Sequence, residues 1–222
     1  MLGDHRVCNQ NPMIITAIER QKWRPRVNVF LDGRLALSLS VGLAAEAGLH
    51  RGDVVTAERL EALRQADERQ QARDVALRLL AYRPRSEEEL RSRLARRGLP
   101  SEVVQETMEH LRERGFVDDA AFARYWVEAR QQSSLRGRRL LRRELLAKGV
   151  AKETAGEAVA AVADDEAARR AAGKKAHSLR NLDYPTFRRR LGQFLLRRGF
   201  PYETARSLVE ELWRQSHPAI SD

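Results

Sequence analysis

A three-part repeat constrains the fold of this chain most strongly. In each copy, two leucines four residues apart are followed four residues later by a glycine, and an apolar helical stripe comes next. The glycines are Gly98, Gly149 and Gly199, which lie 51 and then 50 residues apart. The leucine pairs are Leu90 and Leu94, Leu141 and Leu145, and Leu191 and Leu195. A fixed period of this size is typical of tandem supersecondary units that stack on one another.

Capping residues mark the helix boundaries within the repeat. Ser86 opens a capping box, in which its hydroxyl accepts a hydrogen bond from the amide three residues on while Glu89 reaches back. Pro84 ends the preceding helix, because the residue before a proline disfavours the helical conformation. Gly98 stands where a helix C-terminus favours glycine. Each unit is therefore predicted to be a module of three helices.

A β pattern precedes the repeats. Apolar residues alternate in three runs: Ile14, Thr16 and Ile18, then Val27, Val29 and Leu31, then Leu35, Leu37 and Leu39. Asp32 and Gly33 separate the second run from the third. An Asp-Gly pair between two alternating runs is a strong hairpin signal, because a type I′ turn needs positive φ at both central residues.

Two short amphipathic helices are expected after the hairpin, at residues 41–49 and 56–66, and a separate helix at 67–83 then begins the repeats. The predicted fold is mainly α, with three tandem three-helix repeats that form an elongated curved array after a small N-terminal β-hairpin region. The expected divisions are a disordered leader at 1–12, the β-hairpin region with short helices at 13–66, helical repeats at 67–117, 118–163 and 164–216, and a tail at 217–222.

Composition points to a basic intracellular protein. The net charge is +10, with 41 Lys and Arg against 31 Asp and Glu, and this excess favours an acidic partner. A protein that is merely soluble and basic is the alternative. No run approaches the roughly 18 apolar residues of a membrane span, and no secretory signal is visible. The lone Cys8 cannot form an intramolecular disulfide, which favours a cytoplasmic location.

No catalytic or metal-binding motif stands out. The histidines lack metal-ligand spacing, and there is no glycine-rich phosphate loop or nucleophile elbow. Asp118 and Asp119 allow two interpretations, a catalytic carboxylate pair or helix caps. Asp164 and Asp165 stand at the equivalent place one repeat later, which favours capping. We therefore predict a protein that is not an enzyme and has no metal and no cofactor.

Arginines are the candidate binding residues. Residues 130–148 hold seven Lys or Arg against the single acid Glu144. With Leu141 and Leu145 facing the core, Arg139 and Arg143 fall on the opposite side of the helix, with Arg136 beside them. Arginine suits bidentate contacts to phosphate or carboxylate, whereas an ordinary solvated helix face is the alternative. The predicted contact residues are Arg136, Arg139, Arg142, Arg143, Lys148, Arg189, Arg190, Arg197 and Arg198.

Two kinds of partner fit such arginines. A nucleic acid would be bound through its phosphates, largely without regard to sequence, and each neutralised phosphate would add close to one unit to the salt dependence of log K. A protein would place acidic residues against the same arginines, again with salt-sensitive binding. The residue pattern alone leaves both open.

Three segments in order resemble the repeats of the RecX family, bacterial regulators of the RecA recombinase. The likeness covers about residues 67–215. The first segment is Ser86-Glu87-Glu88-Glu89-Leu90 with Leu94, Gly98 and Leu111, followed by Gly115-Phe116-Val117-Asp118-Asp119, Phe122 and Ala123. The second is Gly137, Leu141, Leu145 and Lys148-Gly149-Val150. The third is Lys174-Lys175, Tyr184, Phe187, Leu191 and Arg198-Gly199-Phe200.

The resemblance implies a cytoplasmic, non-enzymatic helical protein that lies along the groove of the RecA–DNA filament. It also implies inhibition of RecA ATPase, strand exchange and filament growth, in recombination and the SOS response. Binding of single- and double-stranded DNA is a further trait of the family. A monomer without membrane contact is the default expectation. The alternatives are a general sequence-independent DNA-binding repeat protein without a recombinase partner and, third, a nuclease built on the aspartate pairs.

Overall fold

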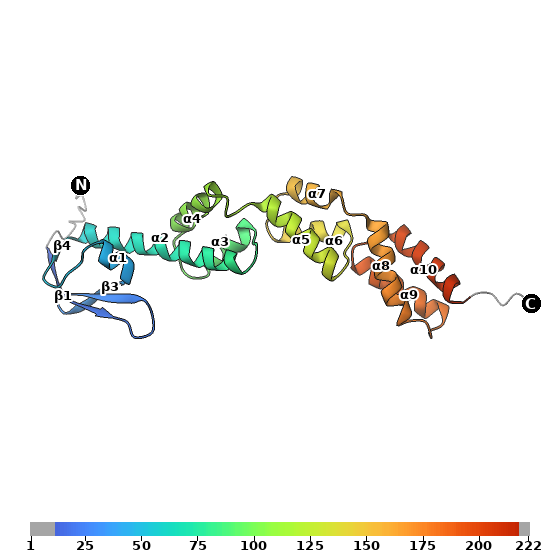
Figure 1. Cartoon of the computed structure of the whole chain (residues 1–222), viewed down its shortest axis with the longest axis horizontal. Helices are drawn as coiled ribbons and strands as arrows, with labels where there is room; N and C mark the ends of the chain where they lie inside the picture. The colour runs from blue at the N-terminus through green and yellow to red at the C-terminus, as the bar shows by residue number, and fades with distance from the viewer. Residues whose placement is uncertain (1–11, 218–222) are drawn as a thin grey trace, which may run out of the picture. The chain divides into compact units, whose positions relative to one another are not determined.

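The computed structural model describes residues 12–217, so the expected leader and tail lie almost entirely outside the described residues (Figure 1). The chain divides into two compact units. The N-terminal unit runs as far as Arg78 and includes Leu94–Thr107, and the C-terminal unit comprises Leu79–Arg93 and the chain from Met108 onward.

A four-stranded antiparallel sheet opens the N-terminal unit, in the order β3-β2-β1-β4. The strands are β1 (Met13–Arg20), β2 (Arg26–Leu31), β3 (Arg34–Ser40) and β4 (Val54–Val55). Between β2 and β3, Asp32 and Gly33 have φ angles of 47° and 80°. Positive φ at both positions is what a type I′ turn requires, so the predicted hairpin is confirmed.

The predicted alternation is wrong at two places in the sheet. Ile15 is buried, whereas Ile14 is 48% exposed, because the pairing of β1 with β2 has an irregular register after Ile15. Such a bulge changes which side chains face the core, and Ile18 still packs against it. In β3, Leu39 is buried while Leu35 is 58% exposed. A register shift of one residue cannot be predicted from an apolar run, because such a run looks the same before and after the shift.

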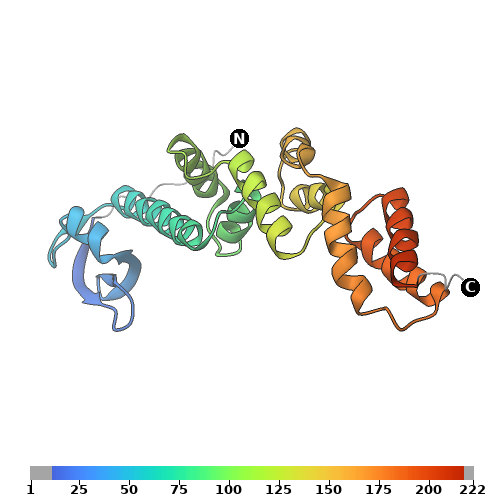
Figure 2. The same ribbon diagram turned by 45° about the vertical axis from the view of Figure 1, so that its right-hand side comes forward.

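One long helix, α2 (Ala57–Tyr82), replaces the two helices expected at 56–66 and 67–83. It contains no glycine or proline that would break it, and it is the long teal helix in Figure 2. Asp67, in its middle, is 2% exposed and accepts hydrogen bonds from the Ser40 amide at 2.8 Å and from Arg26 Nη2 at 2.7 Å. This carboxylate therefore ties α2 to β2 and to the start of the short helix α1 (Val41–Glu46).

The predicted fold class, a mainly helical chain with three-helix repeats after a small β region, is confirmed. The helices beyond α2 are α3 (Glu87–Ala95), α4 (Ser101–Glu113), α5 (Asp119–Ser133), α6 (Arg138–Ala147), α7 (Lys152–Ala160), α8 (Asp164–His177), α9 (Tyr184–Arg197) and α10 (Tyr202–Ser216). The six repeat leucines are all 0% exposed. In the second and third repeats they pack with Phe122 and Phe187 respectively.

Two of the predicted caps are confirmed. Ser86 Oγ accepts a hydrogen bond from the Glu89 amide at 3.2 Å, and Asp118 accepts from the amides of Ala120 and Ala121 at 2.8 and 3.0 Å. The reciprocal half of the capping box is wrong. The Glu89 carboxylate instead binds the side chains of Arg83 and Lys148.

Candidate nucleic-acid interface

Consecutive repeats of the C-terminal unit are joined by an aspartate at the start of the later repeat. Asp119 accepts a hydrogen bond from the Glu87 amide at 2.9 Å, and Asp164 accepts from the Arg138 amide at 2.8 Å. Each carboxylate thus caps the second helix of the preceding repeat, not its own helix. Burial raises the pKa of Asp119, while the Glu87 amide opposes the rise. Capping therefore accounts for these aspartates without a catalytic role.

Close backbone approach forms the rest of each joint. Ser86 Oγ donates to the Lys148 carbonyl at 2.6 Å, and the Gly137 amide donates to the Arg198 carbonyl at 2.8 Å. A Cβ on Gly149 would collide with the side chain of Glu88, and one on Gly199 would lie 2.6 Å from the Leu140 nitrogen. These two glycines therefore do more than end helices, which is all that the sequence pattern indicated.

Charged side chains reinforce the joint between the first and second repeats. Glu89 lies 2.6 Å from Lys148 Nζ and 3.1 Å from Arg83 Nη1. Burial favours the neutral form of Glu89, but the two cations outweigh it and lower its pKa from 4.5 to about 2.

We expect Glu89→Gln to lower the free energy of unfolding at pH 7 by roughly 1–3 kcal/mol, because two charge-assisted hydrogen bonds are lost. A folded-state pKa below the ordinary value stabilises the fold above pH 4.5, and this contribution disappears as the pH falls toward 2. Urea unfolding at a series of pH values measures the difference from the unsubstituted protein. Glu88→Gln, at an exposed position, is the control. A difference that does not shrink at low pH would contradict the assignment.

A groove at the joint between the second and third repeats collects arginines. Its volume is about 1060 Å³, and we call it the basic groove. Its polar lining comes mainly from Arg138, Arg139, Arg142, Arg143 and Arg197. Its apolar lining comes from Leu140, Leu146, Val159, Leu196, Phe200, Pro201 and Tyr202. Residues from α6, from α9 and from the start of α10 therefore share one concave surface.

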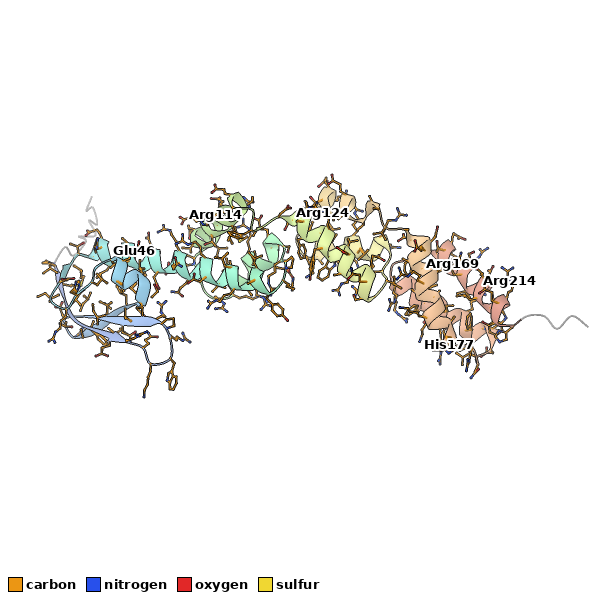
Figure 3. The ribbon with its side chains drawn as sticks, in the orientation of Figure 1. Glu46, Arg114, Arg124, Arg169, His177 and Arg214 are labelled. Atoms are coloured by element: carbon orange, nitrogen blue, oxygen red, sulfur yellow. The ribbon has the colours of Figure 1, made fainter. Side chains whose placement is uncertain are left out.

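Most of these guanidinium groups have no partner. Within residues 12–217, no hydrogen bond or ion pair is made by the side chains of Arg139, Arg142, Arg143 and Arg197. In Arg142 even the Nε atom, which is buried, has no hydrogen-bond partner. Only Arg138 is paired, with Asp164 at 3.2 Å. Arginines elsewhere in the C-terminal unit do form ion pairs with acidic side chains. Arg169 on α8, labelled in Figure 3, lies 2.7 Å from Glu211 on α10. The basic groove therefore concentrates positive charge that the fold leaves uncompensated.

Three predicted contact residues make interactions within the fold. Arg136 forms an ion pair with Glu144 and is partly buried, which lowers its pKa. It therefore does not extend the exposed stripe of Arg139 and Arg143, and that expectation is wrong. Lys148 binds Glu89 and lies 4.3 Å from the centre of the Trp126 ring. Arg198 donates to the Leu135 carbonyl and lies 4.5 Å from the centre of the Phe194 ring.

The remaining two predicted residues lie outside the basic groove. Arg189 lines a second, smaller groove of about 410 Å³ between α9 and α10, with Arg188 and Arg206. Arg190 is exposed and lines neither groove. Sequence reasoning missed Tyr202, which is 58% exposed and lines both grooves. An aromatic residue three positions after the repeat glycine Gly199, at the start of a predicted helix, was the available signal.

The arrangement suits binding to anions. Unpaired guanidinium groups can contact phosphate or carboxylate in a bidentate manner, and the apolar lining can contact sugars, bases or side chains. In the described part of the chain, no three His, Cys, Asp or Glu residues come together to hold a metal ion. None of the described helices is long and apolar enough to span a membrane.

Family models of known proteins match nearly the whole described chain. The models of the first, second and third three-helix domains of RecX match residues 72–111, 118–159 and 163–218. The model of the regulatory protein RecX N-terminal domain matches residues 13–56. The N-terminal sheet is thus part of the family pattern, although the likeness noted from the sequence began only at the repeats.

Individual relatives and solved structures point to the same family as the family models. The regulatory protein RecX of Clostridium botulinum (strain Eklund 17B / Type B) is 30% identical over 203 residues, covering 89% of this chain and 95% of the relative. That of Amycolatopsis mediterranei is 37% identical over 147 residues, covering 65% and 84%. A crystal structure of regulatory protein RecX superposes with a TM-score of 0.63 at 25% identity, covering 90% of this chain and 99% of that one. The chain belongs to the RecX family of regulatory proteins.

Proposed function

We propose that this protein binds the RecA–DNA filament and inhibits RecA ATPase, strand exchange and filament growth, and so limits recombination and the SOS response. The observation that carries the proposal is the basic groove, where four unpaired arginines meet at the joint of the second and third repeats. Membership of the RecX family supplies the class of partner. The protein is proposed to act as a cytoplasmic monomer.

Anion binding at the basic groove supports filament binding physically. A RecA–DNA filament presents phosphates beside a protein surface, and guanidinium groups can bind both phosphate and carboxylate. In the groove, Arg139 and Arg143 lie on α6 and Arg197 lies on α9, so their placement depends on two repeats being joined. The groove offers cations without a recognition helix, so binding is expected to be independent of DNA sequence.

RecA ATPase on single-stranded DNA tests the proposal. The purified protein should lower ATP turnover at substoichiometric amounts, because one bound molecule can block filament growth beyond its own site. Sedimentation of the protein with filaments formed on oligothymidylate should show binding in the same range of concentration. Unchanged ATP turnover at an equimolar ratio to RecA would contradict the proposal.

General DNA binding without a recombinase partner is the second candidate. The unpaired arginines favour it as much as they favour filament binding. In that case, RecA ATPase would fall only when the protein covers most of the DNA, and raising the DNA concentration would restore the activity. Inhibition that depends on the protein-to-RecA ratio at saturating DNA would exclude this candidate.

A further inference from the structure

The turn between β1 and β2 displays a tryptophan almost completely to solvent. Trp23 is 89% exposed, more than any other large apolar side chain in the described residues. Exposing an indole forgoes the burial of a large apolar surface, because Trp side chains bury 150–250 Å² each on average. Single exposed apolar residues are common on protein surfaces, so the neighbours of Trp23 decide whether it has a role.

Those neighbours are basic and unpaired. Arg20, Lys22 and Arg24 alternate around Trp23 and are exposed. Their side chains make no hydrogen bond or ion pair with any residue between 12 and 217. The only acid in residues 19–26, Glu19, forms no ion pair with them. The turn therefore combines an aromatic surface with three free cations.

Hydrogen bonds and an ion pair hold both ends of the turn. The Gln21 amide donates to the Arg26 carbonyl at 2.9 Å, and Gln21 Nε2 donates to Asn28 Oδ1 at 2.7 Å. Arg26 in turn binds the buried Asp67 of α2 at 2.7 Å. The scaffold thus fixes the turn, and Trp23 is presented on a preorganised loop instead of a loose one.

We propose that this turn is a second nucleic-acid contact, where Trp23 stacks on an unpaired base and Arg20, Lys22 and Arg24 contact the flanking phosphates. Aromatic residues beside a basic track are how proteins bind single strands without reading sequence, and each stacked base is worth roughly 1–3 kcal/mol. A duplex keeps its bases stacked inside, so the turn discriminates in favour of single strands. The contact goes beyond the proposed function, because it requires neither RecA nor the basic groove.

Binding of the full-length protein to a labelled oligothymidylate, followed by fluorescence anisotropy, tests the contact. Trp23→Ala should weaken binding about 5- to 150-fold, the range that corresponds to one lost stack. Trp23→Phe should retain most of the affinity. Binding to a duplex of the same length should change less than twofold in both variants. Quenching of tryptophan fluorescence by unlabelled oligothymidylate should also diminish in Trp23→Phe, because the exposed indole is the one that stacks.

Tyr82→Ala is the matched control, because Tyr82 is also exposed, at 85%, but lies at the end of α2, outside the turn. It should bind oligothymidylate like the unsubstituted protein. Unchanged affinity in Trp23→Ala, or an equal loss for single strands and duplex, would overturn the proposal. So would a loss of binding to DNA-free RecA with DNA binding intact, since that result assigns the turn to a protein partner. These assays contain no ATPase step, so their outcome is independent of RecA inhibition.

Discussion

Gly199→Ala is expected to lower the free energy of unfolding of the C-terminal unit by about 3–4 kcal/mol. Two causes act together. The φ angle of Gly199 is +83°, where a side chain adds roughly 1–2 kcal/mol of strain. A Cβ would also lie 2.6 Å from the Leu140 nitrogen, and backbone cannot yield as a flexible side chain does. Urea unfolding and hydrogen exchange at α6 and α9 measure the loss.

Gly98→Ala separates these two causes. Gly98 has nearly the same φ, +78°, and the same place after a repeat helix, but nothing lies within 4 Å of its added Cβ. It should therefore lower the free energy of unfolding of its own, N-terminal unit only by the strain, about 1–2 kcal/mol. If Gly199→Ala proved no more destabilising than Gly98→Ala, the close approach of the second and third repeats would be refuted.

Reversing two groove charges, Arg139→Glu with Arg143→Glu, is expected to have the largest effect on binding. Both side chains are exposed and unpaired, so the fold should tolerate the change. Affinity for DNA at low salt should fall about 10- to 100-fold, and the slope of log K against log salt should shrink by about two units. Anisotropy titrations at several salt concentrations measure both quantities.

Arg96→Glu with Arg97→Glu is the matched control. It changes the net charge equally, and both residues are exposed and outside the basic groove. DNA affinity should fall only slightly, through the reduced overall charge. An equal loss in both double variants would mean that net charge governs binding, and the basic groove would lose its special role.

Local chemistry explains why much of the fold was predictable. The leucine pairs face the core because residues at i and i+4 share one helix face. Asp118 caps a helix, and Asp32-Gly33 forms a hairpin turn, through interactions that span only a few residues. Short-range patterns of this kind are visible in a single sequence.

Interactions between repeats explain what was missed. Asp164 caps a helix 26 residues earlier, and the Gly137 amide meets a carbonyl about 60 residues later, so neither pairing has a local signal. The same limit applies to the candidate site. The helical pattern predicts an exposed Arg136, because the ion pair with Glu144 depends on side-chain placement that the pattern does not show. Arg139 and Arg197 share a groove only once two repeats are joined.

Trp23 illustrates a different limit. Its basic neighbours are visible in the sequence, but the alternating residues at 20–24 are as typical of a continuing strand as of an exposed turn. Only the fold shows that the strand pairing stops at Arg20, and that Gln21 and Arg26 hold the two ends of the turn. Exposure of an aromatic residue is a tertiary property, and sequence patterns do not report it.

Titration of RecA ATPase on single-stranded DNA, with the unsubstituted protein and both double arginine variants, tests the central claim most directly. At saturating DNA, the unsubstituted protein and Arg96→Glu/Arg97→Glu should inhibit at substoichiometric amounts. Arg139→Glu/Arg143→Glu should need at least tenfold more protein for the same inhibition. Equal inhibition by all three proteins, or none by the unsubstituted protein, would contradict filament binding through the basic groove.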